Sequence, residues 1–148
     1  MKAQQERFLI VSVSDKRFAF PLKDIAEVME TFRTYPIPKA PPEYVGVMNS
    51  HGAPVPVLDF GSFLHGRPAR QSGTILVIDS RIGSLALLVD GIEKIVSGCT
   101  AETGSERDWL SGTSLELEME TIPSPSLEKL VALLEETLQG SGATSRKP

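Results

Sequence analysis

The chain has 148 residues and a mass of 16.1 kDa, which fits one compact domain or two small lobes that share a core. Its net charge of −4 and pI near 5.2 argue against a surface that binds nucleic acid or anionic lipid electrostatically. A single cysteine and two histidines exclude an internal disulfide and a Cys/His zinc centre, so we expect no metal and no cofactor.

The N-terminus is polar, and the apolar run that follows it spans only Phe8 to Val13. This run is too short for a signal-peptide core or a membrane span, so we expect a cytoplasmic protein without membrane insertion. Its composition predicts a strand, and Phe18 to Phe20 predicts a second strand after a polar turn. The segment from Asp24 to Met29 suits either a short helical turn or the entry to a strand.

Four prolines fall between residues 35 and 42, which predicts an ordered extended loop or a polyproline-like connector. Two apolar runs follow, Val45 to Met48 and Val55 to Leu58, on either side of a turn-forming group at 49–52. This pattern predicts a β-hairpin in which Gly52 takes a positive φ. Two prolines in the second run, at 54 and 56, should keep that strand near a sheet edge. Residues 61–66 leave room for one short turn of helix.

The second half repeats this plan, with strands predicted at 74–78 and 85–89 around a turn at 79–83. Residues 90–93 then echo residues 24–27, because each segment has an Asp followed three residues later by a Glu. We interpret the echo as two related β-lobes. The frequent turn signals favour small barrels or a sandwich over a parallel sheet. Asp59 and Asp90 each end an apolar strand and are interpreted as turn or cap residues.

Residues 97–108 are polar and are predicted to form a mobile loop, and the alternation at 115–120 predicts a half-buried strand. A C-terminal helix should be capped by Ser124, have Pro125 at its first position and end at Gly140. Its apolar stripe comprises Leu127, Leu130, Val131, Leu134 and Leu138. We expect residues 1–139 to form one domain and residues 140–148 a disordered tail.

The hairpin sequence Asn49-Ser50-His51-Gly52, followed by Val55-Pro56-Val57-Leu58-Asp59, resembles the central hairpin of the CheW-like family of chemotaxis coupling proteins. The element 25–28, the connector that ends at residues 42–47 and the strand 85–90 also resemble that family, in the same order. The resemblance covers residues 8 to 138 and is looser after residue 90. It implies a mainly β fold with two intertwined SH3-like five-stranded β-barrel lobes and a C-terminal helix.

The resemblance also implies an adaptor without catalytic activity. Such an adaptor bridges the cytoplasmic tip of a chemoreceptor and the regulatory domain of the histidine kinase CheA. The resemblance places the partner-binding groove and its rim at Glu27, Val28, Met29, Ile37, Pro38, Gly46, Val47, Asn49 and His51. By spacing alone, the apolar residues among these suit a core as well as they suit a groove.

Two features depart from the family pattern. The family carries Arg where this chain has His51, so a permanent charge facing Glu27 becomes a titratable one. Two prolines between residues 120 and 125 should shorten the last strand. The first departure leaves open a divergent protein that has lost one partner and modulates a pathway, and a self-associating β-barrel module is a further alternative. His51 and Asp59 do not suggest an enzyme, because no nucleophile or orienting group accompanies them.

Overall fold

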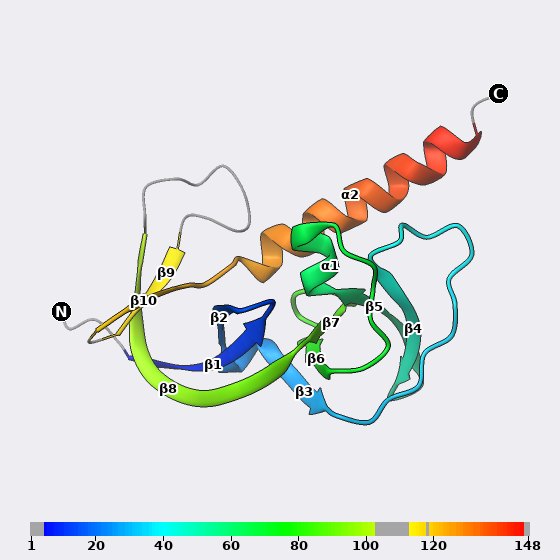
Figure 1. The fold of residues 1–148 in the computed structure, drawn as a ribbon. Coiled ribbons are helices and arrows are strands. Elements are labelled where there is room, and N and C mark those ends of the chain that lie inside the picture. The colour runs from blue at the N-terminus through cyan, green and yellow to red at the C-terminus, as the bar shows by residue number, and fades with distance from the viewer. Residues whose placement is uncertain (1–4, 103–112, 118, 147–148) are drawn as a thin grey trace.

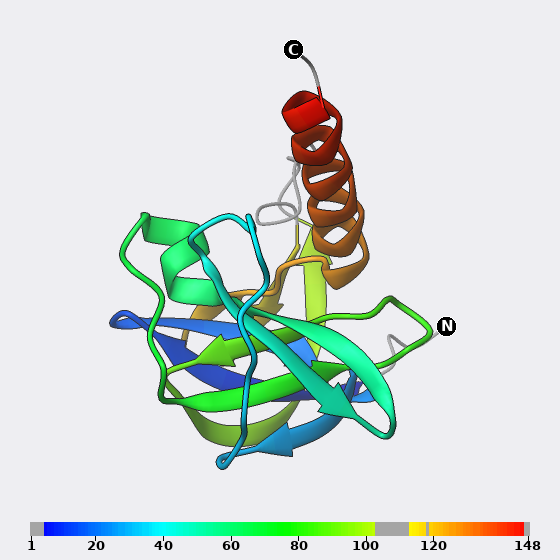
Figure 2. The same ribbon diagram turned by 90° about the vertical axis from the view of Figure 1, so that its right-hand side faces the viewer.

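The computed structural model describes residues 5–102, 113–117 and 119–146 of the chain. Over these ranges the elements are, in order, β1 (Glu6–Val13), β2 (Lys16–Pro21), the 3-10 turn η1 (Leu22–Asp24), β3 (Ile25–Met29), β4 (Tyr44–Ser50), β5 (Ala53–Asp59), α1 (Phe60–His65), β6 (Thr74–Ile78), β7 (Ala86–Val89), β8 (Gly91–Glu102), β9 (Thr113–Glu116), β10 (Thr121–Pro123) and α2 (Leu127–Arg146). Figures 1 and 2 show the strands gathered into one body from which the far end of α2 extends. The predicted strands at 8–13, 74–78 and 85–89 and the short helix after residue 60 are therefore confirmed.

The strands form two five-stranded sheets that exchange hairpins between the halves of the chain (Figure 1). The first lobe has the order β10-β9-β8-β1-β2, so the N-terminal hairpin joins strands from the C-terminal half. The second lobe has the order β3-β6-β7-β5-β4, so the β6–β7 hairpin lies inside a sheet built from the first half. This exchange confirms the prediction of two intertwined lobes.

The two lobes have the same cyclic strand order when β1 to β5 are matched with β6 to β10 in sequence order. The first sheet opens between β2 and β10, and the second opens between β3 and β4. The echo between residues 24–27 and 90–93 therefore marks equivalent positions, at the entries to β3 and β8. Neither sheet closes into a complete hydrogen-bonded barrel over the described residues, so the predicted SH3-like lobes are two open five-stranded sheets.

One residue partly closes the second sheet. Tyr35, in the proline-rich connector, forms an isolated antiparallel bridge to Val47 on the edge strand β4. The Tyr35 N–H lies 2.8 Å from the Val47 oxygen, and the Val47 N–H lies 2.7 Å from the Tyr35 oxygen. Gly46 makes this approach possible, because a Cβ there would lie 2.5 Å from the Tyr35 carbonyl oxygen. The connector is thus an ordered extended segment, as the prolines predicted.

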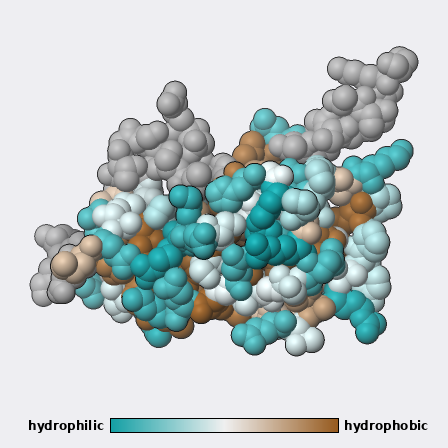
Figure 3. Space-filling model, in the orientation of Figure 1, coloured by the Kyte–Doolittle hydropathy of each residue, from teal (hydrophilic) through white to brown (hydrophobic). Residues whose placement is uncertain are grey.

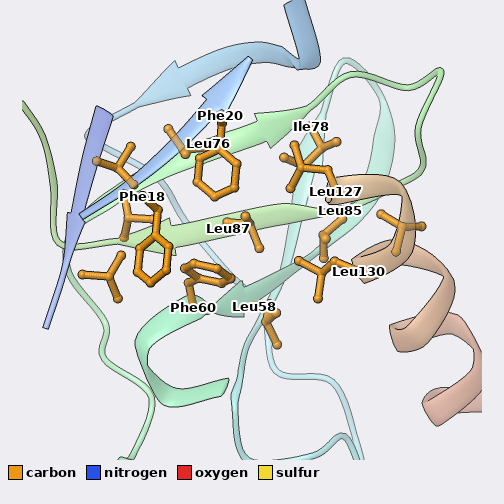
Figure 4. Packing of buried hydrophobic residues seen from close by; sticks show 14 of the residues in the cluster. Phe18, Phe20, Leu58, Phe60, Leu76, Ile78, Leu85, Leu87, Leu127 and Leu130 are labelled. Atoms are coloured by element: carbon orange, nitrogen blue, oxygen red, sulfur yellow. The ribbon is translucent and has the colours of Figure 1, made fainter. Parts of the chain in front are cut away.

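A shared apolar cluster lies between the two lobes and α2 (Figure 4). Phe18 and Phe20 from β2 make edge-on contacts with Phe60 from α1, at centroid distances of 5.3 and 6.0 Å. Leu127 and Leu130 cover the cluster from α2, and both are buried. Because residues from both lobes and the helix fill this cluster, each lobe depends on the other for burial of part of its apolar surface, while two smaller clusters lie within single lobes.

Two expectations for the strands after residue 90 are corrected by the structure. Residues 97–102 belong to β8 because they pair with β1 and β9, while residues 103–108 of the predicted loop lie outside the described residues. The alternating strand ends at Glu116, and Met119 in the following turn is 91% exposed. Long-range pairing and a tight turn here override local composition and periodicity. The final strand, Thr121–Pro123, is short as the prolines predicted.

The C-terminal helix begins and ends later than predicted. Ser126, and not Ser124, caps it, because the Lys129 N–H lies 3.2 Å from the Ser126 hydroxyl oxygen. Ser124 is buried instead, and its N–H donates to the Thr113 carbonyl. The helix continues through Gly140, since glycine weakens a helix without always ending it. The predicted stripe is confirmed for its four buried residues before position 135, and the Leu138 side chain lies outside the described ones.

Candidate functional site

The β4–β5 hairpin carries the turn that the sequence singled out. Its two central residues both have positive φ, 52° at His51 and 84° at Gly52, as type I′ turns require. The Gly52 N–H donates to the Asn49 side-chain oxygen at 2.9 Å and holds the turn in shape. Pro54 and Pro56 lie in a stretch of β5 that pairs only with the edge strand β4, because pairing with β7 begins at Val57. Both hairpin predictions are confirmed.

An ion-pair contact joins the two open edges of the second lobe. His51 Nε2, at the hairpin turn, lies 3.4 Å from Glu27 Oε1 on β3. The imidazole is 86% exposed and the carboxylate 40% exposed, so water screens the contact. A pair of this kind contributes at most about 1 kcal/mol to stability. Its charge also depends on protonation of the imidazole, so the pair contributes little to holding the fold.

A hollow of about 400 Å³ opens beside this pair, at the end of the second lobe. Its lining includes four buried apolar residues, Val55, Val77, Ile78 and Leu85, and rim residues such as His51 and Ser84. The β4–β5 turn forms one wall and the β6–β7 turn forms another. The hollow has the size and the apolar floor to receive one or two side chains of a partner.

The second wall of the hollow is held by Arg81. Its Nε lies 3.1 Å from Asp79 Oδ1 within the β6–β7 turn, and a terminal nitrogen lies 3.3 Å from Asp24 Oδ1. The Asp79 N–H also donates to the Asp24 carbonyl at 2.8 Å, which fixes the turn to the start of β3. Burial raises the pKa of Asp24 above that of an ordinary aspartate, and the neighbouring Arg81 opposes this shift.

Large apolar side chains are exposed on two strands outside the hollow. Val28 on β3 is 43% exposed, and Tyr35 in the connector that follows β3 is 54% exposed. Ile92 and Ile95, at the start of β8, are 37% and 46% exposed. Figure 3 shows apolar patches between polar side chains along the lower edge, where Figure 1 places β3 and β8. Sequence reasoning missed the two isoleucines, because their strand reads as ordinary half-buried β structure until its neighbours are known.

The structure separates the predicted site residues into accessible and packed ones. Val28, Pro38, Asn49 and His51 are exposed, and Glu27, Ile37 and Val47 are half-buried. Met29 packs against the apolar cluster of the second lobe, and Gly46 is buried beneath Tyr35. Their roles in partner binding stay predictions.

The described residues bring no three His, Cys, Asp or Glu side chains together in a group that could hold a metal ion. Among the helices described, none is long and apolar enough to cross a membrane.

The geometry agrees with what comparison with known proteins shows. A family model described as the CheW-like domain matches residues 7–133. The chain belongs to the CheW-like domain family. It is 30% identical over 98 residues to a chemotaxis protein CheW of Rhizobium meliloti (strain 1021), which is 65% of this chain and 59% of that relative's length.

A solved structure supports the fold independently. The scaffolding protein TtCheW from Thermoanaerobacter tengcongensis is similar with a TM-score of 0.69 and 15% identity. The match covers 83% of this chain and 90% of that one. The predicted CheW-like fold, with two intertwined lobes, is therefore confirmed.

Proposed function

We propose that the protein is a non-catalytic adaptor that couples chemoreceptors to the histidine kinase CheA, in chemotaxis or a related chemosensory pathway. The observation that carries the proposal is the CheW-like domain, which spans both lobes of the structure. Over the described residues, its surface offers exposed apolar residues and a shallow hollow that suit docking of a partner. The proposed setting is the cytoplasm, where receptor tips and the kinase meet.

Two surfaces suit two partners. The exposed apolar residues Val28, Ile92 and Ile95 suit the apolar face of a helical receptor tip. The hollow at the end of the second lobe suits a projecting turn from the kinase's regulatory domain, which has the same fold by family resemblance. Glu27 and His51 lie at the rim, where charge sets orientation and partner choice more than affinity.

Calorimetric titration tests the proposal with two probes: the regulatory domain of a CheA kinase from the same genome, and a receptor-tip fragment. We expect micromolar binding to both. Val28→Asp should weaken binding of the receptor fragment at least about tenfold, because it places a charge in the apolar contact. Leu133→Asp is the matched control, since Leu133 is 38% exposed, belongs to α2 rather than to β3 or β8, and is not among the residues that line the hollow. Equal effects of the two variants would contradict the assignment of the receptor surface.

His51 supports a second candidate function, that of a divergent member that keeps only one partner and modulates the pathway. Arg at this position would give Glu27 a permanent and bidentate partner, whereas the imidazole offers one contact at 3.4 Å. His51→Arg should therefore change the affinity for the receptor fragment in the same titration. Unchanged affinity would remove the argument for divergence. Dimerisation of the protein alone at micromolar concentration would favour the self-associating module instead.

A further inference from the structure

Two carboxylates meet at the junction of the lobes because of the strand topology. β5 and β7 pair in parallel, with Asp59 opposite Leu88, so both strands end at the same edge of the second sheet. Asp59 ends β5 and Asp90 directly follows β7. Asp59 is 1% exposed, and two neighbouring carboxylates repel each other unless a cation lies between them.

Arg67 supplies that cation from the segment that follows α1. One terminal nitrogen lies 3.3 Å from Asp59 Oδ1 and 3.7 Å from Asp90 Oδ1, and the other lies 3.4 Å from Asp59 Oδ2. Gly61 makes room for this guanidinium, because a Cβ on Gly61 would lie 2.0 Å from it. Arg70 completes the cluster, since its N–H donates to Asp59 at 2.7 Å and its guanidinium lies 3.1 Å from Asp90. Two positive charges thus balance two negative ones.

The cluster also holds the first lobe. The β1–β2 turn belongs to that lobe, and its Ser14 N–H donates to Asp90 Oδ2 at 2.8 Å. Arg67 Nε lies 3.3 Å from the Ser14 hydroxyl oxygen, and the Asp90 N–H donates to the Ser12 carbonyl at 3.0 Å. Asp90 itself lies between β7 of the second lobe and β8 of the first. The Arg67 side chain therefore reaches from Asp59 of one lobe to the turn of the other.

We infer that Arg67 is a positioning residue that fixes the relative orientation of the two lobes through Asp59, Asp90 and Ser14. The shared apolar core holds the lobes together, but hydrophobic burial is non-directional and permits rotation about the contact. Charge-assisted hydrogen bonds from a planar guanidinium specify an angle as well as a distance. The functional consequence rests on the proposed function, since an adaptor with a partner surface on each side needs its lobes at a set angle.

Residual dipolar couplings of the free protein test the inference. In the unaltered protein, the amides of both lobes should fit a single alignment tensor. In Arg67→Met the couplings of each lobe should still fit its own strands, but the two lobes should require different tensors. Amide exchange at Ser14 should also become about tenfold faster or more, because its acceptor Asp90 loses a cation partner.

The matched control is Arg17→Met. Arg17 also lies between two carboxylates, Glu93 and Glu120, but all three residues belong to the first lobe. This variant should keep one common tensor. If Arg67→Met fails to fold, Gly61→Ala displaces the guanidinium while leaving every charge in place and should give the same split of tensors.

A single common alignment tensor in Arg67→Met, or in Gly61→Ala if that variant is used instead, would overturn the inference. Because the measurement uses the free protein, it does not depend on partner binding. A failure to bind the kinase or receptor probes would overturn the proposed function. It would not affect the inference that Arg67 fixes the orientation of the lobes.

Discussion

Replacement of Phe60 by alanine tests the claim that the two lobes share one core. Phe60 is fully buried in α1 and makes edge-on contacts with Phe18 and Phe20 on β2, so it joins the second lobe to the first. Truncation of a buried phenylalanine costs about 3–5 kcal/mol, through lost burial, the cavity left behind and lost aromatic contacts. In a chain of this length we expect the melting temperature to fall by roughly 6–20 °C.

Urea denaturation followed by far-UV circular dichroism measures the loss. The transition of Phe60→Ala should move to lower urea as one step and with an unchanged slope, because one core serves both lobes. Leu133→Ala is the control, since that leucine is 38% exposed and its truncation should cost less than about 1 kcal/mol. A loss below about 1 kcal/mol for Phe60→Ala, or two separate transitions in the unaltered protein, would refute the shared core.

Three further predictions address the contact between β4 and the connector, the cap of α2 and the pH dependence of stability. Gly46→Ala should destabilise the protein by about 1–3 kcal/mol in urea denaturation, because its Cβ would lie 2.5 Å from the Tyr35 oxygen at a φ of +155°. Ser126→Ala should lower helical stability by about 1 kcal/mol, whereas the same effect from Ser124→Ala alone would contradict the observed cap. Burial raises the pKa of Tyr44 to about 12, so the unfolded chain loses this proton from pH 10 upward while the folded protein retains it. Stability should therefore fall between pH 10 and 12, and Tyr44→Phe should show a smaller fall when urea midpoints are compared across that window.

Local patterns in the sequence predict local structure well in this protein. The β4–β5 hairpin follows from two apolar runs around a glycine-containing turn, and the two prolines lie where β5 has one neighbour. The echo between residues 24–27 and 90–93 marks real equivalence, since both segments enter matched strands of two lobes with the same cyclic order. The residues of a turn and a repeated short motif can be recognised in the sequence without knowledge of long-range contacts.

The features that escaped prediction depend on pairing between distant segments. Residues 97–102 read as a loop because they are polar, yet pairing with β1 and β9 makes them strand. Ser124 followed by Pro125 fits the local pattern of a helix start, yet the path of the chain into α2 makes Ser126 the cap. Arg67 gave no local signal, because its acid partners become neighbours only when β5 and β7 pair in parallel.

The exposure of the candidate site residues also depends on pairing between distant segments. Family resemblance placed a partner surface around β3 and the hairpin, and Val28 and His51 are exposed there. It did not reveal that Met29 packs inward or that Ile92 and Ile95 on β8 are exposed. These orientations depend on the bulge in β3 and on the pairing of β8 with β1, and neither can be recognised from the local sequence pattern.

Sedimentation velocity of a mixture of this protein, the CheA regulatory domain and a receptor-tip fragment tests the adaptor role most directly. The proposed function predicts a boundary that contains all three components and sediments faster than either binary complex. Binary complexes that compete with each other and never combine would contradict it, because an adaptor must hold both partners at once.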